Sequence, residues 1–139
     1  MKPKFQNIQK SAKLEDNRKA LRFSVKEIEG SPSFSFNHFS EKGYGIGDCR
    51  LDDYGYMIKK LKTLGKSDWN TINNSARHGL GFEKIDKKIL NAKLPSDVPE
   101  DVKLYAFRYN GKKPMVGYRE GDVFHIIFLD IDFSLYDHS

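Results

Sequence analysis

The alternation of apolar and polar residues is clearest in the last third of the chain, where it predicts three strands. Residues 103–109 and 114–119 are separated by Asn110-Gly111, a pair typical of tight hairpin turns. Glu120-Gly121-Asp122 marks a second turn, and residues 123–129 after it are apolar almost throughout. We therefore expect an antiparallel three-strand meander whose last strand is central and covered on both faces.

Before the meander, apolar residues recur at three- and four-residue steps and predict a helix from about Asp48. Its apolar stripe comprises Leu51, Tyr54, Met57, Ile58, Leu61 and Leu64. Gly65 is expected to end this helix, and Ser67 to cap a second one that ends at Gly79. The buried residues of the second helix are expected to be Trp69, Ile72 and Ala76. Together the two helices would form an αα-hairpin.

The first third of the chain predicts less regular structure. Residues 21–25 and 33–39 alternate and predict N-terminal strands, whereas residues 1–20 are polar and Lys-rich and predict a flexible basic arm. A chain of 139 residues fits one domain. The predicted fold is thus a single α+β domain over residues 21–139, with N-terminal strands, an αα-hairpin and a C-terminal antiparallel three-strand meander.

Composition narrows the cellular setting. The single Cys49 cannot form an internal disulfide. No apolar stretch approaches the roughly 18 residues that a membrane-spanning helix needs, and no secretory signal pattern is visible. We therefore expect a cytoplasmic protein with no membrane partner and no cofactor.

The net charge of +5 is unevenly distributed along the chain. Residues 55–94 are rich in Lys, whereas residues 95–139 contain more acidic than basic side chains. Such a distribution favours a polyanion or an acidic protein as partner, although a solvated Lys-rich surface would give the same pattern. The residues predicted to contact nucleic acid are Arg77, His78, Lys84, Lys112 and Lys113.

Two arginines of the meander could bind a phosphate. Pairing through the predicted first turn sets Arg108 opposite Lys113 and puts Arg119 on the same face of the sheet, with Gly117 leaving a shallow space beside them. The planar guanidinium of Arg binds phosphate through two parallel hydrogen bonds. The alternative is that both are ordinary surface charges paired with nearby carboxylates.

Groups that can move protons lie in and after the last predicted strand. His125 lies inside the apolar run, where a hydrogen-bonded core role is the alternative to catalysis. Asp130, Asp132 and His138 follow and could hold a divalent cation, although Asp is also frequent where strands end. The sequence contains no motif of the common hydrolases or nucleotide-binding proteins.

Several stretches resemble a family of small uncharacterised bacterial and phage proteins. They are residues 77–85, 114–119, 123–125 and 135–138, and the likeness extends from about residue 33 onward without implying an activity. The order of an αα-hairpin, an antiparallel meander and an aromatic tail in a basic chain also resembles the RelE/ParE/HigB-like toxins. Members of that family are small ribonucleases or gyrase poisons that pair with antitoxins.

The resemblance to these toxins implies roles for particular residues. An arginine of the sheet would stabilise the scissile phosphate, a role that Arg119 matches. Proton transfer by a Tyr or His after the last strand is matched by Tyr136 or His138. The basic residues that would grip RNA are Arg108, Lys112 and Lys113.

The leading hypothesis is therefore a toxin-like, RNA-binding, metal-independent endoribonuclease, in which the 2′-hydroxyl of RNA attacks the adjacent phosphate. The predicted catalytic residues are Arg119, Arg108, His125, Tyr136 and His138. The alternative is a non-catalytic binding protein, such as an immunity protein, an antitoxin or a phage accessory factor, that docks an acidic partner. A metal-dependent nuclease built on the two aspartates and the histidine of the tail is a weaker third hypothesis.

Overall fold

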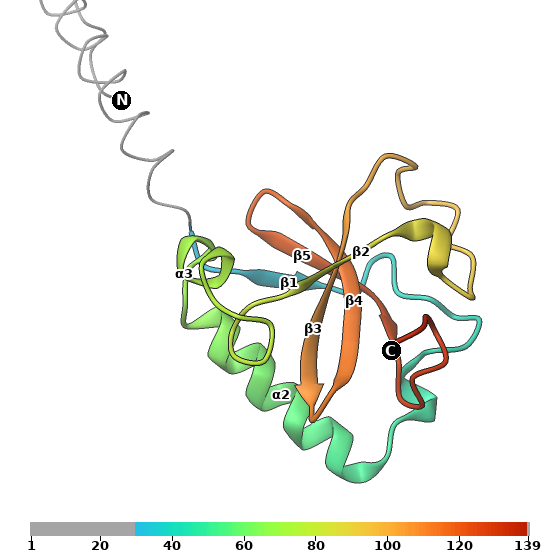
Figure 1. The fold of residues 1–139 in the computed structure, drawn as a ribbon, viewed down its shortest axis with the longest axis horizontal. Helices are drawn as coiled ribbons and strands as arrows, with labels where there is room; N and C mark the ends of the chain where they lie inside the picture. Colours follow the sequence, from blue (N-terminus) through green and yellow to red (C-terminus); the bar gives the residue numbers. More distant parts are fainter. Residues whose placement is uncertain (1–29, 139) are drawn as a thin grey trace, which may run out of the picture.

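The computed structural model describes residues 30–138, which form one mixed five-strand sheet and two helices (Figure 1). In chain order the elements are β1 (Ser33–Ser35), η1 (Ile46–Asp48), α2 (Leu51–Gly65), α3 (Trp69–Asn73), β2 (Glu83–Ile85), η2 (Lys87–Ile89), β3 (Leu104–Asn110), β4 (Lys113–Glu120) and β5 (Val123–Leu129). The strand order is β1-β5-β4-β3-β2, with β1 parallel to β5 and the other pairs antiparallel. The predicted α+β class is confirmed.

Strands β3, β4 and β5 form the predicted antiparallel meander. β5 is buried from Phe124 to Leu129, as expected for a strand covered on both faces, but the central strand of the sheet is β4. This difference arises because β1 pairs outside β5 and β2 pairs outside β3. β1 ends at Ser35 rather than residue 39, and the three residues of β2 are too few to produce a recognisable alternation.

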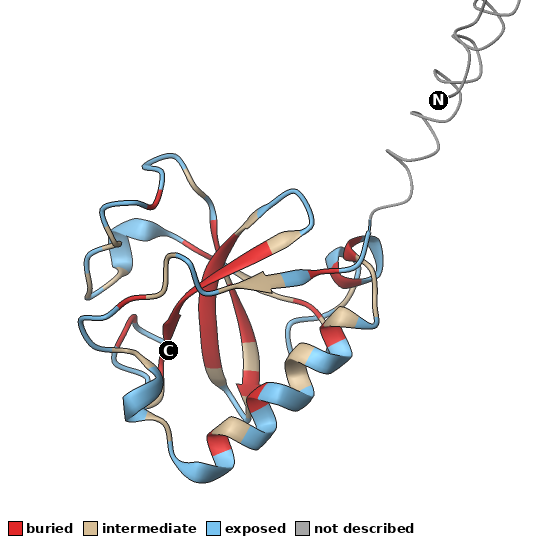
Figure 2. Ribbon diagram, turned by 180° about the vertical axis from the view of Figure 1, so that it is seen from behind, coloured by how far each residue is buried: buried red, intermediate tan, exposed pale blue. Residues whose placement is uncertain are grey.

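Buried residues run along the strands of the sheet (Figure 2), and they form two core clusters, one on each face. On the face that we call the helix face, the buried core residues are Met57, Leu64, Trp69, Ile72, Phe107, Tyr109, Met115, Phe124, Ile126 and Leu129. On the opposite face, which we call the tail face, they are Ile85, Val98, Leu104, Ala106, Val116, Tyr118, Ile127, Phe128, Leu135 and Tyr136. The helices cover the first face, while the connection between β2 and β3 and the C-terminal tail cover the second.

The predicted first helix is confirmed as α2, although its buried strip is narrower than the apolar stripe in the sequence. Met57 and Leu64 are buried against the sheet, whereas Leu51 and Ile58 are 89% and 61% exposed. Asp53 is fully buried on the same side of the helix. The helix therefore places a carboxylate, and not only apolar side chains, against the sheet.

The second helix is shorter than predicted. Its N-cap is Asp68, whose carboxylate accepts the Thr71 N–H at 2.7 Å, and not Ser67. It ends at Asn73 instead of Gly79 because Asn74 and Ser75 donate their side-chain hydrogen bonds to carbonyls of the preceding turn. Of the three residues expected to form the buried face of this helix, Trp69 and Ile72 are buried, but Ala76 is exposed.

The predicted pairing of β3 with β4 is wrong by one residue. Arg108 lies opposite Pro114, not Lys113, because Gly111 and Lys112 form the turn and the ladder is irregular between Arg108 and Asn110. Gly111 adopts a φ of 59°, which glycine accepts without strain. A shift of one residue moves a strand's side chains to the other face, so the expected partners of Arg108 change.

Two further expectations concern residues 1–20 and 21–25, which lie outside the described residues. Within residues 30–138, no helix has the length and apolar character needed to cross a membrane.

Candidate functional site

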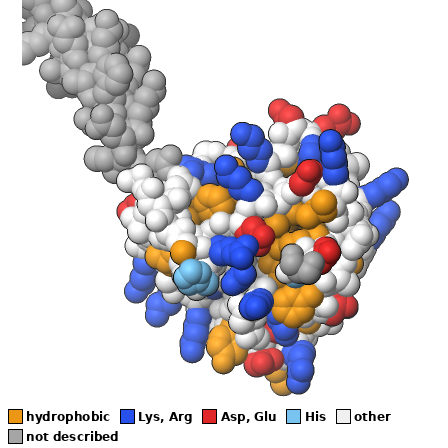
Figure 3. Space-filling model, in the orientation of Figure 1, with side chains coloured by type: hydrophobic (Ala, Val, Ile, Leu, Met, Phe, Trp, Pro, Cys, Tyr) orange, Lys and Arg blue, Asp and Glu red, His pale blue; other side chains and the backbone are white. Residues whose placement is uncertain are grey.

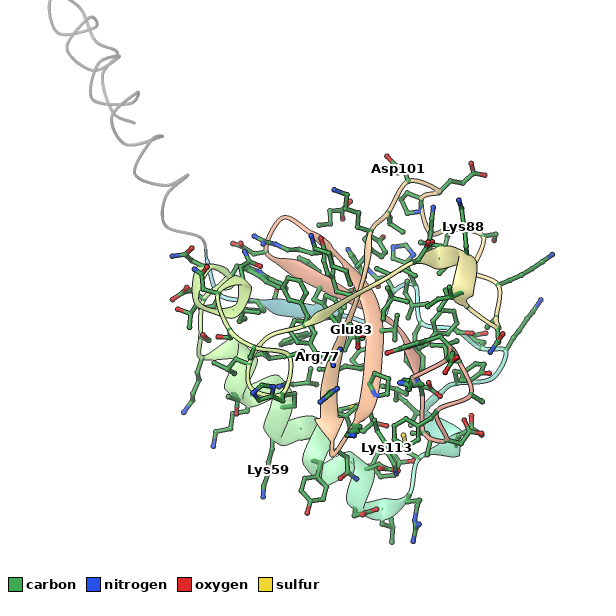
Figure 4. The ribbon with its side chains drawn as sticks, in the orientation of Figure 1. Lys59, Arg77, Glu83, Lys88, Asp101 and Lys113 are labelled. Carbon is green, nitrogen blue, oxygen red and sulfur yellow. The ribbon has the colours of Figure 1, made fainter. Side chains whose placement is uncertain are left out.

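A pocket of about 450 Å³ opens on the tail face beside the C-terminal tail. We call it the tail pocket, and its lining residues are Arg77, Glu83, Ala106, Arg108, Lys112, Pro114, Phe133, Tyr136, Asp137 and His138. Figure 3 shows hydrophobic side chains gathered on this face of the molecule, with Lys and Arg side chains beside them. In Figure 4, Arg77 and Glu83 lie close together over the sheet. Residues from distant parts of the sequence therefore meet at one surface depression.

Half of the site residues predicted from the sequence line this pocket. They are Arg77, Arg108, Lys112, Tyr136 and His138. The observed register points Arg108 to the tail face, on the same side as Ala106 and Pro114. The chain reverses after β5 and carries the tail back over this face, which brings the last two of these residues to the arginine.

The reversal after β5 is held by one buried carboxylate. Asp130 is fully buried and accepts the backbone N–H groups of Ser134 at 3.0 Å and Leu135 at 3.2 Å. Its Oδ2 also lies 2.9 Å from His138 Nε2. With the Nε2 proton donated to this carboxylate, His138 Nδ1 retains its lone pair and can accept a proton. Asp130 thus fixes both the tail and the tautomer of the imidazole.

Tyr136 is stacked on His138, with ring centroids 4.0 Å apart and an interplanar angle of 27°. Burial raises the pKa of the Tyr136 hydroxyl well above its usual value, and the negative charges of Glu83 and Asp130 raise it further. Arg108 and Arg77 oppose this shift only in part. The phenol is therefore protonated at neutral pH and is suited to donate a proton or a hydrogen bond.

The basic residues of the tail pocket differ in their partners. Arg77 Nη1 lies 3.2 Å from Glu83 Oε1, and both side chains remain partly exposed. Within residues 30–138, Arg108 forms no ion pair, so its guanidinium can bind an anion without losing a carboxylate partner. Lys112 is exposed in the β3–β4 turn. These three cations give the pocket its capacity for a phosphate or carboxylate group.

Arg119 does not share a face with Arg108, so the prediction of a paired arginine site is wrong. Its guanidinium lies 4.2 Å from the centroid of the Trp69 ring, on the helix face, and its Nε donates to the Gly121 carbonyl at 2.6 Å. Gly117 is buried and leaves no shallow space, because a Cβ at this position would overlap the His125 carbonyl oxygen.

His125 lies at the other end of β4 and β5 and does not line the tail pocket. It is 6% exposed, stacks on Tyr118 at 4.7 Å and places Nε2 3.2 Å from Glu120 Oε1. His38 lies against the same imidazole, with ring centroids 5.0 Å apart. These contacts fit the alternative role of a core histidine.

The remaining predicted contacts are also away from the pocket lining. Lys113 Nζ lies 2.9 Å from Oδ1 of the buried Asp53, so this lysine joins β4 to α2 (Figure 4). Lys84 is exposed on the edge strand β2, and His78 is exposed in the connection before it. Neither residue is among those that line the tail pocket.

The third hypothesis required a metal ion among the acidic groups of the tail. In the part of the chain that the structure describes, no three His, Cys, Asp or Glu side chains are grouped so that they could hold a metal. Asp130 is instead occupied by the N–H groups described above, and Asp132 accepts the Ser134 hydroxyl at 2.6 Å. Hydrogen bonding to Ser134 lowers the pKa of the Asp132 carboxyl.

Sequence reasoning missed three residues of this site. It considered Asp130 only as a metal ligand in the weakest hypothesis or as a strand-end residue, and not as a partner of His138, and it gave no role to Glu83 or Phe133. The spacing of Asp130 and His138 was a usable signal only with the knowledge that the chain reverses between them.

Comparison of the chain with protein-family models, with curated proteins and with solved structures finds no match.

Proposed function

We propose that the protein is a cytoplasmic, toxin-like endoribonuclease that cleaves single-stranded RNA at the tail pocket by acid–base chemistry. The observation that carries this proposal is that a carboxylate-oriented His138, a protonated Tyr136 and Arg108, which has no ion pair within residues 30–138, meet in one pocket. A general base, a proton donor and a cation are the groups needed for attack of a 2′-hydroxyl on its neighbouring phosphate.

The proposed reaction assigns one step to each group. His138 Nδ1 takes the proton of the 2′-hydroxyl as that oxygen bonds to phosphorus. Arg108 stabilises the negative charge that grows on the phosphoryl oxygens. The bond from phosphorus to the 5′-oxygen breaks, and Tyr136 protonates the leaving oxygen. The products are a 2′,3′-cyclic phosphate and a 5′-hydroxyl, and proton exchange through solvent restores the two side chains.

The flanking cations would hold the RNA backbone without taking part in the reaction. Arg77 and Lys112 also line the pocket and can each contact a phosphate. Each contact on a single strand contributes about −0.7 to the slope of log affinity against log salt, so three cations would give roughly −2. Lys113 is excluded from this grip because its ammonium is paired with Asp53.

The test is cleavage of an end-labelled single-stranded RNA by purified protein in the presence of EDTA. Wild-type protein should produce fragments with 2′,3′-cyclic phosphate ends. His138→Ala should slow cleavage by about 10²–10⁴-fold, the usual contribution of a general base, and Arg108→Ala by a similar factor. Lys112→Ala should lower affinity and flatten the salt slope by one contact while leaving cleavage of bound RNA intact.

Two basic residues outside the pocket serve as matched controls. Lys59 is exposed on α2 and lies away from the tail pocket (Figure 4), so Lys59→Ala should cleave as wild type does. Arg119→Met should also retain cleavage. If Arg119 were catalytic, as the toxin resemblance implies, this substitution would abolish cleavage. Retained cleavage in His138→Ala would contradict the proposal.

The alternative function remains a binding protein that docks an acidic partner, such as an antitoxin, through the same cations. It predicts binding of an acidic protein that depends on Arg108, with no RNA cleavage at any ionic strength. Inducible expression in bacteria separates the two outcomes. Growth arrest with fragmented RNA, abolished by His138→Ala, supports the ribonuclease, whereas normal growth and intact RNA support the binding protein.

A further inference from the structure

Phe133 is an aromatic residue of the tail pocket that none of the proposed steps uses. Its side chain is 41% exposed, although it is large and apolar. The ring lies against His138 in an edge-to-face arrangement, with centroids 5.2 Å apart. Tyr136, in contrast, is 3% exposed and is stacked on the His138 ring. Phe133 is therefore the pocket aromatic that offers a substantial accessible surface.

The backbone conformation of Phe133 is also unusual for a large side chain. Its φ of 63° lies in the left-handed region, which glycine and asparagine accept and a bulky residue adopts at a cost. Such a conformation persists only where its surroundings impose it, and outliers of this kind gather at functional sites. The folding of this turn alone would favour a glycine over a phenylalanine.

Two carboxylates that precede Phe133 accept the backbone N–H of the residue that follows it. Asp130 Oδ1 and Asp132 Oδ1 both accept the Ser134 N–H, at 3.0 Å and 3.2 Å. The same Asp130 orients His138 through its other oxygen. One buried carboxylate consequently bonds both to the backbone next to Phe133 and to the imidazole of His138, which the Phe133 ring contacts.

We propose that Phe133 is a stacking platform for an unpaired nucleobase of the RNA, next to the phosphate bound by Arg108. This inference rests on the proposed function and adds that the substrate is recognised through its bases as well as its backbone. Bases of single strands stack on exposed aromatic side chains because every base has a π-face. A pocket of about 450 Å³ has room for one nucleotide, whereas a base paired in a duplex is not free to stack there.

The experiment measures binding of two short single-stranded probes by fluorescence anisotropy. Both probes carry 2′-O-methyl groups, which remove the nucleophile and prevent cleavage; one bears adenine at every position and the other is abasic. Wild-type protein should bind the base-bearing probe about tenfold or more tightly than the abasic probe. Phe133→Gly should bind both probes equally, and Phe133→Tyr, which keeps the ring, should retain the preference.

Phe133→Gly is a clean variant because glycine suits the positive φ of this position, so its melting temperature should not fall. Phe36→Ala is the matched control, since Phe36 is 44% exposed and does not line the tail pocket. Equal affinity of Phe133→Gly and wild type for the base-bearing probe would overturn the platform. If wild type binds both probes equally and Arg108→Ala weakens both, only the platform fails; if wild type binds neither, the proposed function fails with it.

Discussion

Among residues 30–138, the helix face and the tail face of the sheet each bury one carboxylate, and the two have different partners. On the helix face, Asp53 accepts hydrogen bonds from Lys113 Nζ at 2.9 Å, Asn110 Nδ2 at 2.8 Å and the Arg50 N–H at 2.8 Å. On the tail face, Asp130 is bound by two backbone N–H groups and by His138. The first carboxylate is neutralised by a fixed cation, whereas the second has a partner that can gain and lose a proton.

The two arginines of the meander repeat this contrast. Arg119 lies over the Trp69 ring and donates to a carbonyl, so its charge serves packing on the helix face. Arg108 projects into the tail pocket without an ion pair among the described residues. The same residue type therefore has a structural role on one face and a candidate binding role on the other. Under the proposed function, the arginine without an ion pair among the described residues lies on the face that binds RNA.

The largest effect on stability is expected on the helix face, from Trp69→Ala. Trp69 is 2% exposed, contacts Phe107 and Phe124, and donates its indole N–H to the Asp122 carbonyl at 3.0 Å. Loss of this side chain should cost about 3–5 kcal/mol in the free energy of unfolding, measured with urea. Trp69 is the only tryptophan, so ready quenching of its native fluorescence by iodide would show it exposed and contradict the prediction.

The second-largest loss of stability is expected on breaking the ion pair between Asp53 and Lys113. Asp53→Ala leaves the Lys113 ammonium, whose side chain is 19% exposed, without its partner. Unfolding by urea should show a loss of about 3 kcal/mol, the low end of the range for a broken buried pair. The double variant Asp53→Leu with Lys113→Met should recover part of the loss, because it removes the unpaired charge. A loss of only a few tenths of a kcal/mol in the single variant would mean that the pair is not structural.

A smaller effect should appear in the pH dependence of stability. Burial alone would raise the pKa of the Asp53 carboxyl, but hydrogen bonds from the Arg50 N–H, Lys113 and Asn110 outweigh it and lower the pKa below its unfolded value. A lowered native pKa contributes stability above the unfolded pKa of about 4, and this contribution is lost as the pH falls through the native value. Wild-type stability should therefore fall more steeply than that of Asp53→Asn below about pH 4, in urea titrations at each pH. Parallel curves would be the contrary result.

The smallest effect on stability is expected on the tail face, from Arg108→Ala. Because Arg108 has no ion pair within residues 30–138, its removal should change the free energy of unfolding by no more than about 0.5 kcal/mol. The same variant should lose most of its RNA cleavage under the proposed function. A loss of several kcal/mol would place Arg108 with the structural side chains of the helix face and remove the contrast between the two faces.

The periodicity of apolar residues was sufficient to predict the meander and α2. Apolar residues at three- and four-residue steps predicted α2, and turn sequences separated the three C-terminal strands. Local patterns failed where side chains competed with the backbone. Asn74 and Ser75 end α3 early, and Asp53 is buried within a helix whose apolar Leu51 is left exposed. The early end of α3 involves only local hydrogen bonds, whereas the burial of Asp53 depends on Asn110 and Lys113, which are distant in the sequence.

About half of the candidate site could be predicted from the sequence. The chemically suitable residue types could be identified, but not which of them lie together in the fold. Arg108, Tyr136 and His138 were identified as chemically suitable, and the tail pocket brings them together. Arg119 and His125 were equally suitable by type and lie elsewhere. Phe133 gave no signal, since an exposed phenylalanine with a positive φ is not visible in a sequence.

Local periodicity and turn residues depend only on near neighbours, so the amino-acid sequence was enough to predict β3, β4, β5 and α2, but not the three-residue strand β2. The register of the sheet, and with it the face of each arginine, was decided by tertiary structure. β4 is buried from Pro114 to Tyr118 on both faces, so its residues do not alternate and a shift of one position leaves the pattern unchanged. The shift was fixed instead by the irregular pairing before Asn110, whose side chain is bound to Asp53 of α2.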